Sequence, residues 1–165
     1  MTLRIAINGY GRIGRNIVRA LYENPRYESR IEIVAINDLA KFEAMAHLTR
    51  FDSTHGRFDR RVVLQGDKLC IGEAQIQLLS VADPLALPWR ALAVDVVLEC
   101  SGALLTRAQA EQHLQAGAGR VLVSAPGQDL DATLVYGVNE QMLKPEHRLI
   151  SNASCTTNCL APLCQ

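Results

Sequence analysis

Residues 3–14 read LRIAINGYGRIG, an apolar run followed by three closely spaced glycines. Residues 3–8 form a short β-branched run, and residues 12–23 place apolar side chains at helical spacing. The turn between them has the spacing Gly-x-Gly-x-x-Gly. A second apolar run over residues 31–37 completes a strand–helix–strand unit. In this context the stretch predicts the first βαβ unit of a dinucleotide-binding fold.

Each glycine of this turn has a separate physical task. Gly9 permits the tight turn, Gly11 leaves room where a pyrophosphate approaches, and Gly14 lets the helix pack closely on the strand. The backbone N–H groups of Arg12 and Ile13, at the positive end of the helix, can then hold phosphate oxygens. The alternative is a glycine-rich turn that binds nothing.

Asp38 lies at the end of the second strand, where a carboxylate can accept hydrogen bonds from both ribose hydroxyls of an adenosine. A 2′-phosphate there would meet like charge, and no arginine follows Asp38 directly. These features favour NAD over NADP. In the alternative interpretation, Asp38 only caps the helix expected over residues 41–49.

The rest of the chain continues an α/β pattern. Three short runs between residues 61 and 80 predict an antiparallel meander inserted into the parallel framework. A strand over 94–100, a helix from the cap Thr106 to about 116, and strands over 120–124, 133–136 and 149–150 follow. We therefore predict one doubly wound, Rossmann-type, mostly parallel sheet over residues 1–154.

Composition narrows the class of partner. The 165 residues carry 17 basic and 17 acidic side chains, so no long-range field attracts nucleic acid or an anionic membrane. The N-terminus lacks the apolar run of a signal peptide. The number of cysteines is five, and an odd number in a chain without a secretory signal argues against a disulfide framework. We expect a cytoplasmic protein that acts on a small molecule, with no nucleic-acid or membrane partner.

The run SCTTNC at 154–159 places the Cys155 thiol at a predicted helix N-terminus, where N–H groups favour the thiolate. Cys155 is the candidate nucleophile; from spacing alone, an inert core thiol is equally acceptable. We expect Cys70, Cys100, Cys159 and Cys164 to be small buried residues. We expect no metal, because the cysteine spacing lacks the paired ligands that zinc usually takes.

The nine residues 151–159, SNASCTTNC, resemble the active-site signature of the glyceraldehyde-3-phosphate dehydrogenase superfamily. Similar stretches occur at 6–15 (AINGYGRIGR), 35–39 (AINDL), 51–58 (FDSTHGRF) and 136–139 (YGVN). The resemblance covers essentially the whole chain.

The resemblance implies that Cys155 attacks the aldehyde of a phosphorylated aldose. The hemithioacetal would pass a hydride to NAD and become a thioester, which splits one hard step into two. Residues that match Ser154 and Thr156 flank the nucleophile in this superfamily and help to bind substrate or phosphate. Residues that match Ser101 and Ser124 lie along the cofactor.

Two departures from the superfamily pattern concern the cofactor and the nucleophile. Val81-Ala82 stands where Glu-Arg is common, so we expect a backbone contact from Ala82 without a side-chain contact near the adenine. The histidine that activates the nucleophile lies in a C-terminal catalytic domain, which we expect to be absent from this chain. Residues 155–165 would begin the active-site helix, and this half alone would be inactive. The resemblance also implies a homo-oligomer, a tetramer, for the full-length protein.

The substrate depends on the branch of the superfamily. Residues 87–98, 129–133 and 146–148 look more like the erythrose-4-phosphate branch, whereas Ser-Ala-Pro at 124–126 looks more glycolytic. We expect oxidation of D-erythrose 4-phosphate to 4-phosphoerythronate. The alternatives are the phosphorylating oxidation of glyceraldehyde 3-phosphate and a non-catalytic NAD-binding module.

Overall fold

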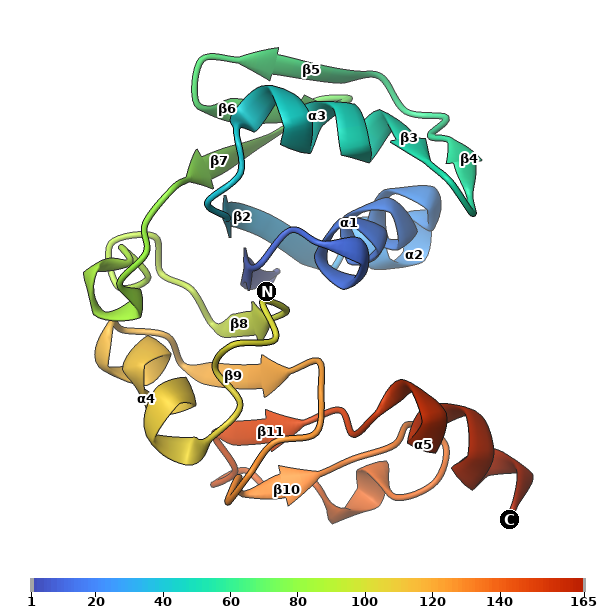
Figure 1. Cartoon of the computed structure of the whole chain (residues 1–165), viewed down its shortest axis with the longest axis vertical. Helices are drawn as coiled ribbons and strands as arrows, with labels where there is room; N and C mark the ends of the chain where they lie inside the picture. Colours follow the sequence, from blue (N-terminus) through green and yellow to red (C-terminus); the bar gives the residue numbers. More distant parts are fainter. Residues whose placement is uncertain (1, 165) are drawn as a thin grey trace.

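The computed structural model describes residues 2–164, and its centre is a mostly parallel sheet. Within those residues the sheet has nine strands (Figure 1). In sheet order they are β10 (Ala132–Thr133), β11 (Leu149–Ser151), β9 (Arg120–Val123), β8 (Val96–Glu99), β1 (Leu3–Asn8), β2 (Ile31–Asn37), β7 (Ala74–Leu79), β6 (Lys68–Ile71) and β5 (Val62–Gln65). The predicted fold class, a Rossmann-type α/β sheet, is confirmed.

The parallel and antiparallel parts of the sheet meet at β7. β1 pairs in parallel with β2 and β8, and β7 pairs in parallel with β2. β5, β6 and β7 pair antiparallel with one another in sequence order. The meander predicted between residues 61 and 80 is therefore present, and it forms one edge of the sheet.

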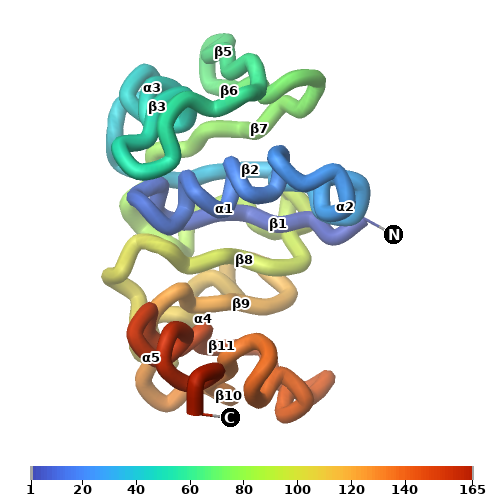
Figure 2. The backbone as a smooth tube through the Cα atoms, turned by 90° about the vertical axis from the view of Figure 1, so that its right-hand side faces the viewer, coloured from blue at the N-terminus to red at the C-terminus, as the bar shows by residue number. Residues whose placement is uncertain are grey.

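Helices cover both faces, as a sheet with parallel strands requires. α1 and α5 lie on one side of the strands and α4 on the other (Figures 1 and 2). The α-helices are α1 (Arg12–Glu23), α2 (Pro25–Glu28), α3 (Phe42–Arg50), α4 (Arg107–Gln115) and α5 (Cys155–Leu160). Short 3-10 turns are η1 (Pro84–Ala86), η2 (Glu140–Met142) and η3 (Ala161–Leu163), and β3 (Phe51–Asp52) pairs with β4 (Gly56–Arg57).

The helix ends follow ordinary capping chemistry. The Thr106 hydroxyl accepts a hydrogen bond from the backbone N–H of Gln109, and the Gln109 side-chain carbonyl accepts one from the backbone N–H of Thr106. This capping box starts α4 where the sequence predicts it. α1 ends before Asn24, because Pro25 begins a new helix and cannot continue the old one.

The core is divided by the sheet. Ile7, Val18 and Ile36 are fully buried in the layer under α1 and α3, and Trp89 and Val97 are fully buried on the opposite face. Near-continuous burial of the last four residues of β1 fits a strand covered on both sides. The central strands are therefore packed between two apolar layers.

Two predicted strands are shorter by at least two residues in the structure. The strand expected over 94–100 begins at Val96, because Ala93 has a φ of 49° and the Val94 N–H turns back to the Trp89 carbonyl. The strand expected over 133–136 is reduced to Ala132–Thr133, and Tyr136 is 85% exposed. No helix within residues 2–164 is long and apolar enough to cross a membrane.

Candidate active site

In the glycine turn between β1 and α1, the backbone lies close to the loop after β8 and to the first turn of α1. Gly9 has a φ of +93°, and a Cβ built there would lie 2.4 Å from the backbone nitrogen of Ser101. A Cβ on Gly14 would lie 2.2 Å from the Gly9 carbonyl oxygen. A Cβ on Gly11 would meet nothing within 4 Å. Two glycines therefore make room for the protein itself, and Gly11 leaves open space beside the first turn of α1.

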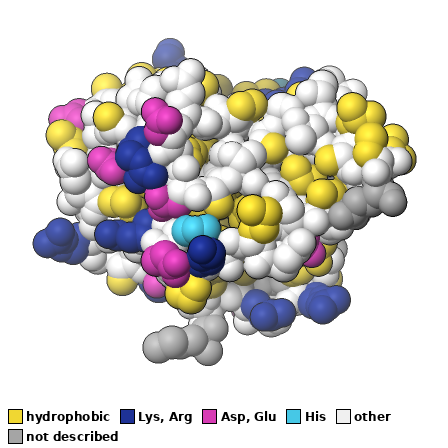
Figure 3. Space-filling model, turned by 90° about the horizontal axis from the view of Figure 1, so that it is seen from below, with side chains coloured by type: hydrophobic (Ala, Val, Ile, Leu, Met, Phe, Trp, Pro, Cys, Tyr) yellow, Lys and Arg dark blue, Asp and Glu magenta, His cyan; other side chains and the backbone are white. Residues whose placement is uncertain are grey.

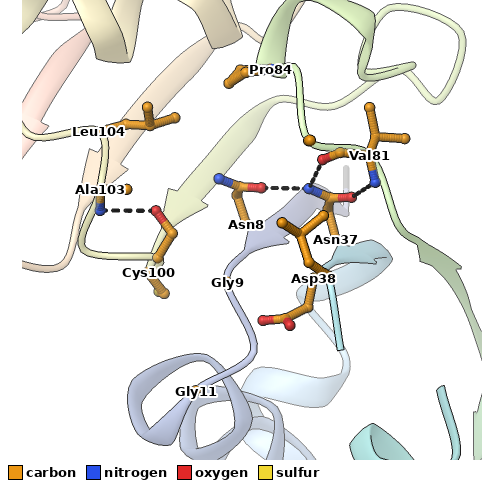
Figure 4. Close-up of a pocket in the computed structure, with 13 residues that line it drawn as sticks. Asn8, Gly9, Gly11, Asn37, Asp38, Val81, Pro84, Cys100, Ala103 and Leu104 are labelled. Carbon is orange, nitrogen blue, oxygen red and sulfur yellow. Dashed lines mark hydrogen bonds between the residues drawn. The ribbon is translucent and has the colours of Figure 1, made fainter. Parts of the chain in front are cut away.

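A cavity of about 420 Å³, here called the strand-end cavity, opens above this turn. Loops that follow β1, β2, β7 and β8 form its walls (Figure 4). Parallel strands put their carboxyl ends at one edge, where ligands of open α/β sheets bind. The lining includes the predicted residues Gly9, Gly11, Asp38, Ala82 and Ser101, together with Asn8, Asn37, Leu39, Val81, Pro84, Cys100, Ala103 and Leu104.

Four predicted cofactor residues lie outside this lining: Arg12, Ile13, Gly14 and Ser124, the last of which directly follows β9. Arg12, Ile13 and Gly14 form the first turn of α1, directly after Gly11, where backbone N–H groups have no partner within the helix. The Arg12 side chain is turned toward Asp52, with 3.6 Å between its Nη1 and the carboxylate. Its contribution to the cavity is therefore limited to the backbone.

Both carboxylate oxygens of Asp38 accept hydrogen bonds from backbone N–H groups. Its Oδ2 accepts a 2.6 Å hydrogen bond from the backbone N–H of Tyr10, and its Oδ1 accepts one of 2.8 Å from the N–H of Ala40. It does not cap α3, whose N-cap residue is Lys41. Asp38 thus fixes the glycine turn against β2 and still presents lone pairs to the cavity. With open space at Gly11 and a helix N-terminus, these features suit a dinucleotide.

Cys155 is the first residue of α5 and is exposed. The hydroxyl of Ser154 accepts a 2.9 Å hydrogen bond from the Thr157 N–H and lies 2.8 Å from the hydroxyl of Thr156. Asn158 donates to the carbonyls of Asn152 and Ser154, at 2.7 and 2.9 Å. These bonds hold the turn that presents the thiol, and the contribution of Asn158 was not predicted from the sequence.

Ala153, two residues before the thiol, has a left-handed φ of 56° although it is not glycine. It is 5% exposed, and its N–H donates to the buried Ser151 hydroxyl at 3.0 Å. Non-glycine residues adopt this conformation only where the surrounding structure enforces it. The polypeptide therefore turns sharply from β11 into α5 and directs Cys155 outward.

A second depression, here called the Cys155 hollow, adjoins the strand-end cavity. It has a volume of about 540 Å³, and Cys100 lines both spaces. Its remaining lining consists of Ile13, Ile17, Leu98, Leu122, Ser124, Asn152, Ala153, Cys155 and Asn158. The structure thus brings Ser124 and Cys155 together, while Ser101 belongs to the neighbouring cavity. None of the histidines in residues 2–164 lines either space.

The remaining cysteines only partly follow expectation. Cys70 is buried and Cys100 is half-buried, whereas Cys159 and Cys164 are exposed. The prediction that Cys159 and Cys164 are buried is wrong for this chain, because α5 and η3 lie on the surface with their outer faces uncovered (Figure 3 shows apolar side chains gathered on this side). Burial raises the pKa of the Cys100 thiol to about 11, against a hydrogen bond with Ser124 that lowers it.

Two comparisons with known proteins bear on this site. Residues 3–107 match the family model described as glyceraldehyde 3-phosphate dehydrogenase, NAD binding domain. The chain is 52% identical over all 165 residues to a glyceraldehyde-3-phosphate dehydrogenase of Pseudomonas aeruginosa. That alignment spans the whole of this chain and 49% of the relative, so the chain has about half the length of the curated protein it matches.

Proposed function

The chain belongs to the glyceraldehyde 3-phosphate dehydrogenase family and is an NAD-binding domain, and from this premise we propose that the whole protein oxidises glyceraldehyde 3-phosphate. The observation that carries the proposal is the shared wall at Cys100, which puts the exposed thiol of Cys155 beside the strand-end cavity. A nucleophile and a dinucleotide site next to each other suit the oxidation of an aldehyde.

In the proposed reaction, the Cys155 thiolate adds to the aldehyde carbon and forms a hemithioacetal. Bound NAD supplies the hydride acceptor. Loss of a hydride and a proton from the hemithioacetal leaves a thioester on Cys155. Inorganic phosphate then attacks the thioester carbon, which releases an acyl phosphate and regenerates the thiolate.

We assign the cofactor to the glycine turn and the nearby loops. Gly9 and Gly11 would form the floor, the N–H groups of Arg12 and Ile13 would face the pyrophosphate, and Asp38 would accept from the ribose. Gly14 would keep the turn close to α1. Ala82, Ser101 and Ser124 would lie along the cofactor, and Ser154 and Thr156 would contact substrate or phosphate.

We also propose that residues 1–154 are the cofactor domain, that α5 begins the catalytic part, and that the general base comes from the portion of the family's proteins that this chain does not match. Two observations support this. No histidine of residues 2–164 lines the Cys155 hollow. Leu160 and Leu163, which follow Cys155, are 61% and 79% exposed, so the active-site segment presents an apolar surface.

The matched relative favours glyceraldehyde 3-phosphate over the erythrose 4-phosphate expected from the branch-like stretches. The structure explains why those stretches say little about substrate. Leu87, Trp89, Val94 and Val97 are buried in the core behind the sheet. Asp131 is tied to Arg107 and to the backbone of β11. Of residues 87–98 only Leu98 lines the Cys155 hollow, and none of residues 129–133 does.

Steady-state rates of the whole protein with both aldehydes, with and without phosphate, test the proposal. We expect faster turnover of glyceraldehyde 3-phosphate and dependence on phosphate. Faster turnover of erythrose 4-phosphate without phosphate would establish the other branch. Turnover of neither aldehyde, with NAD binding retained, would favour a non-catalytic NAD-binding module.

A further inference from the structure

A hydrogen-bonded path of buried polar side chains crosses the floor of the strand-end cavity. Asn8, Asn37 and Glu99 end the adjacent strands β1, β2 and β8, and they share one register, since Asn8 pairs with both other residues. Their exposed fractions are 7%, 4% and 1%. Three polar groups at this depth are retained only when each is hydrogen-bonded.

The side-chain hydrogen bonds along this path are all donated in the direction of Glu99, from Asn37 to Asn8 and from Asn8 to Glu99. The side-chain amide of Asn8 donates to Glu99 Oε2 at 2.6 Å, and its carbonyl accepts from the amide of Asn37 at 2.8 Å. Asn37 also donates to the Val81 carbonyl at 2.9 Å and accepts from the Val81 N–H at 2.9 Å (Figure 4). Because every donor meets an acceptor, neither amide can rotate without losing bonds to both neighbours.

Glu99 is the only member of this hydrogen-bonded path, among the described residues, that accepts without donating. Besides Asn8, it accepts from the Ser101 N–H at 2.7 Å and from the Ser101 hydroxyl at 2.5 Å. From behind the cavity it accepts from His113 Nε2 at 2.9 Å. Trp89 Nε1 donates to His113 Nδ1 at 3.0 Å, so the imidazole carries its proton on Nε2.

The hydrogen-bond donors around Glu99 favour its ionised form. Burial acts to raise the pKa of Glu99, but hydrogen bonds from His113, Ser101 and Asn8 together outweigh it and place the pKa below its ordinary value. Glu99 is therefore a carboxylate with four donors around it. A neutral side chain of the same shape would turn an N–H₂ group toward some of those donors.

Ser101, which Glu99 holds in place, packs against the glycine turn. The Ser101 hydroxyl oxygen accepts from the Ala103 N–H at 3.1 Å, which sets the shape of the loop after β8. The backbone of Ser101 lies against Gly9 so closely that a Cβ on Gly9 would overlap it. Displacement of Ser101 therefore displaces the turn that faces the cofactor.

We propose that Glu99 is a positioning residue for NAD: it acts through Ser101 and Asn8 to hold the loops after β1, β7 and β8 in one arrangement. The inference rests on the assignment of NAD to the strand-end cavity. Glu99 does not line that cavity, so it would act on the cofactor only through the residues it holds.

The first test compares NAD titrations by calorimetry of this chain and of Glu99→Gln. We expect Glu99→Gln to bind NAD about tenfold more weakly, because its amide leaves buried donors without acceptors. Glu99→Asp keeps the charge and should recover most of the affinity. Leu69→Ala, at a buried position of β6 outside the lining of the cavity, controls for loss of stability alone and should bind NAD as the unchanged chain does.

A second readout separates positioning from general destabilisation. In ¹H–¹⁵N spectra without NAD, the side-chain amide signals of Asn8 and Asn37 should shift in Glu99→Gln and stay in place in Leu69→Ala. If Glu99→Gln does not fold, His113→Leu removes one donor from Glu99 outside the cavity and should weaken NAD severalfold. Unchanged affinity in a folded Glu99→Gln or His113→Leu variant would overturn the proposal. An unaltered chain that binds no NAD at millimolar concentration would overturn the cofactor assignment itself.

Discussion

The backbone N–H of Tyr10 donates a 2.6 Å hydrogen bond to the carboxylate of Asp38, so the glycine turn is tied to the end of β2. Tyr10 is the residue between Gly9 and Gly11, and it is 3% exposed. The same carboxylate is the predicted ribose acceptor. Asp38 therefore shapes the turn, and we propose that it also selects the cofactor.

Asp38→Ala should weaken NAD and narrow the preference for NAD over NADP by about tenfold, because like charge no longer opposes a 2′-phosphate. It should also lower the free energy of unfolding by about 1 kcal/mol through the lost N–H contacts. Asp38→Asn keeps one acceptor oxygen and separates charge from hydrogen bonding. Titration with both cofactors measures the ratio, with Asp59→Ala, at an exposed position, as the control. An unchanged ratio of NAD to NADP affinity would show that Asp38 only shapes the glycine turn and does not select the cofactor.

The glycines of the turn should respond differently to the same substitution. Gly11→Ala should keep the melting temperature within a few degrees, since its Cβ enters open space and surface changes cost about 0.5 kcal/mol or less. It should nevertheless weaken NAD. Gly9→Ala and Gly14→Ala should lower the melting temperature by roughly 5 °C or more, because their Cβ atoms overlap backbone. Thermal unfolding by circular dichroism decides, and equal losses for all three would refute this division of tasks.

Asp131 should make part of the stability depend on pH. Burial acts to raise its pKa, but Arg107 and the N–H groups of Leu149 and Arg148 lower it to about 2. The unfolded value is about 3.9. The contribution is therefore complete above that value and is lost as pH falls toward 2.

Asp131→Asn should accordingly lower the melting temperature at pH 7 by roughly 3–6 °C, and the gap to the unchanged chain should narrow between about pH 4 and pH 2. Thermal unfolding at several pH values measures the gap. Glu73→Gln, in the exposed turn between β6 and β7, should show no gap at either end. A gap for Asp131→Asn that is constant with pH would assign the effect to packing.

The strand and helix pattern could be predicted because periodicity and glycine spacing are local. The alignment of Asn8, Asn37 and Glu99 is different. Each lies at the end of a buried strand, and AIN occurs twice, at 6–8 and 35–37, which was the available signal. Their hydrogen bonds depend on the register between strands, which no local pattern specifies. The exposure of Cys159 likewise depends on what covers α5, and its spacing from Cys155 contains no such information.

The last prediction is that Cys155 reacts faster than the other four thiols while this chain forms no NADH from an aldehyde. Cys70 is buried, and Cys100 ionises only near its pKa of about 11. Cys159 and Cys164 are exposed competitors, but they lie beyond the first turn of α5, whereas Cys155 is the first residue of that helix and lines the Cys155 hollow. Turnover needs a base, and no histidine of residues 2–164 lines the Cys155 hollow.

Limiting iodoacetamide, followed by peptide mass mapping, ranks the thiols, and NADH absorbance is recorded in parallel. Cys155→Ser should remove the fast-labelled peptide and leave the others unchanged, whereas Cys159→Ser should not slow the fast phase. First labelling at Cys159 or Cys164 would contradict the choice of nucleophile, since exposure alone would then set the order. NADH formation by this chain would show that the residues around the Cys155 hollow already supply the base, and the proposed requirement for a further domain would be wrong.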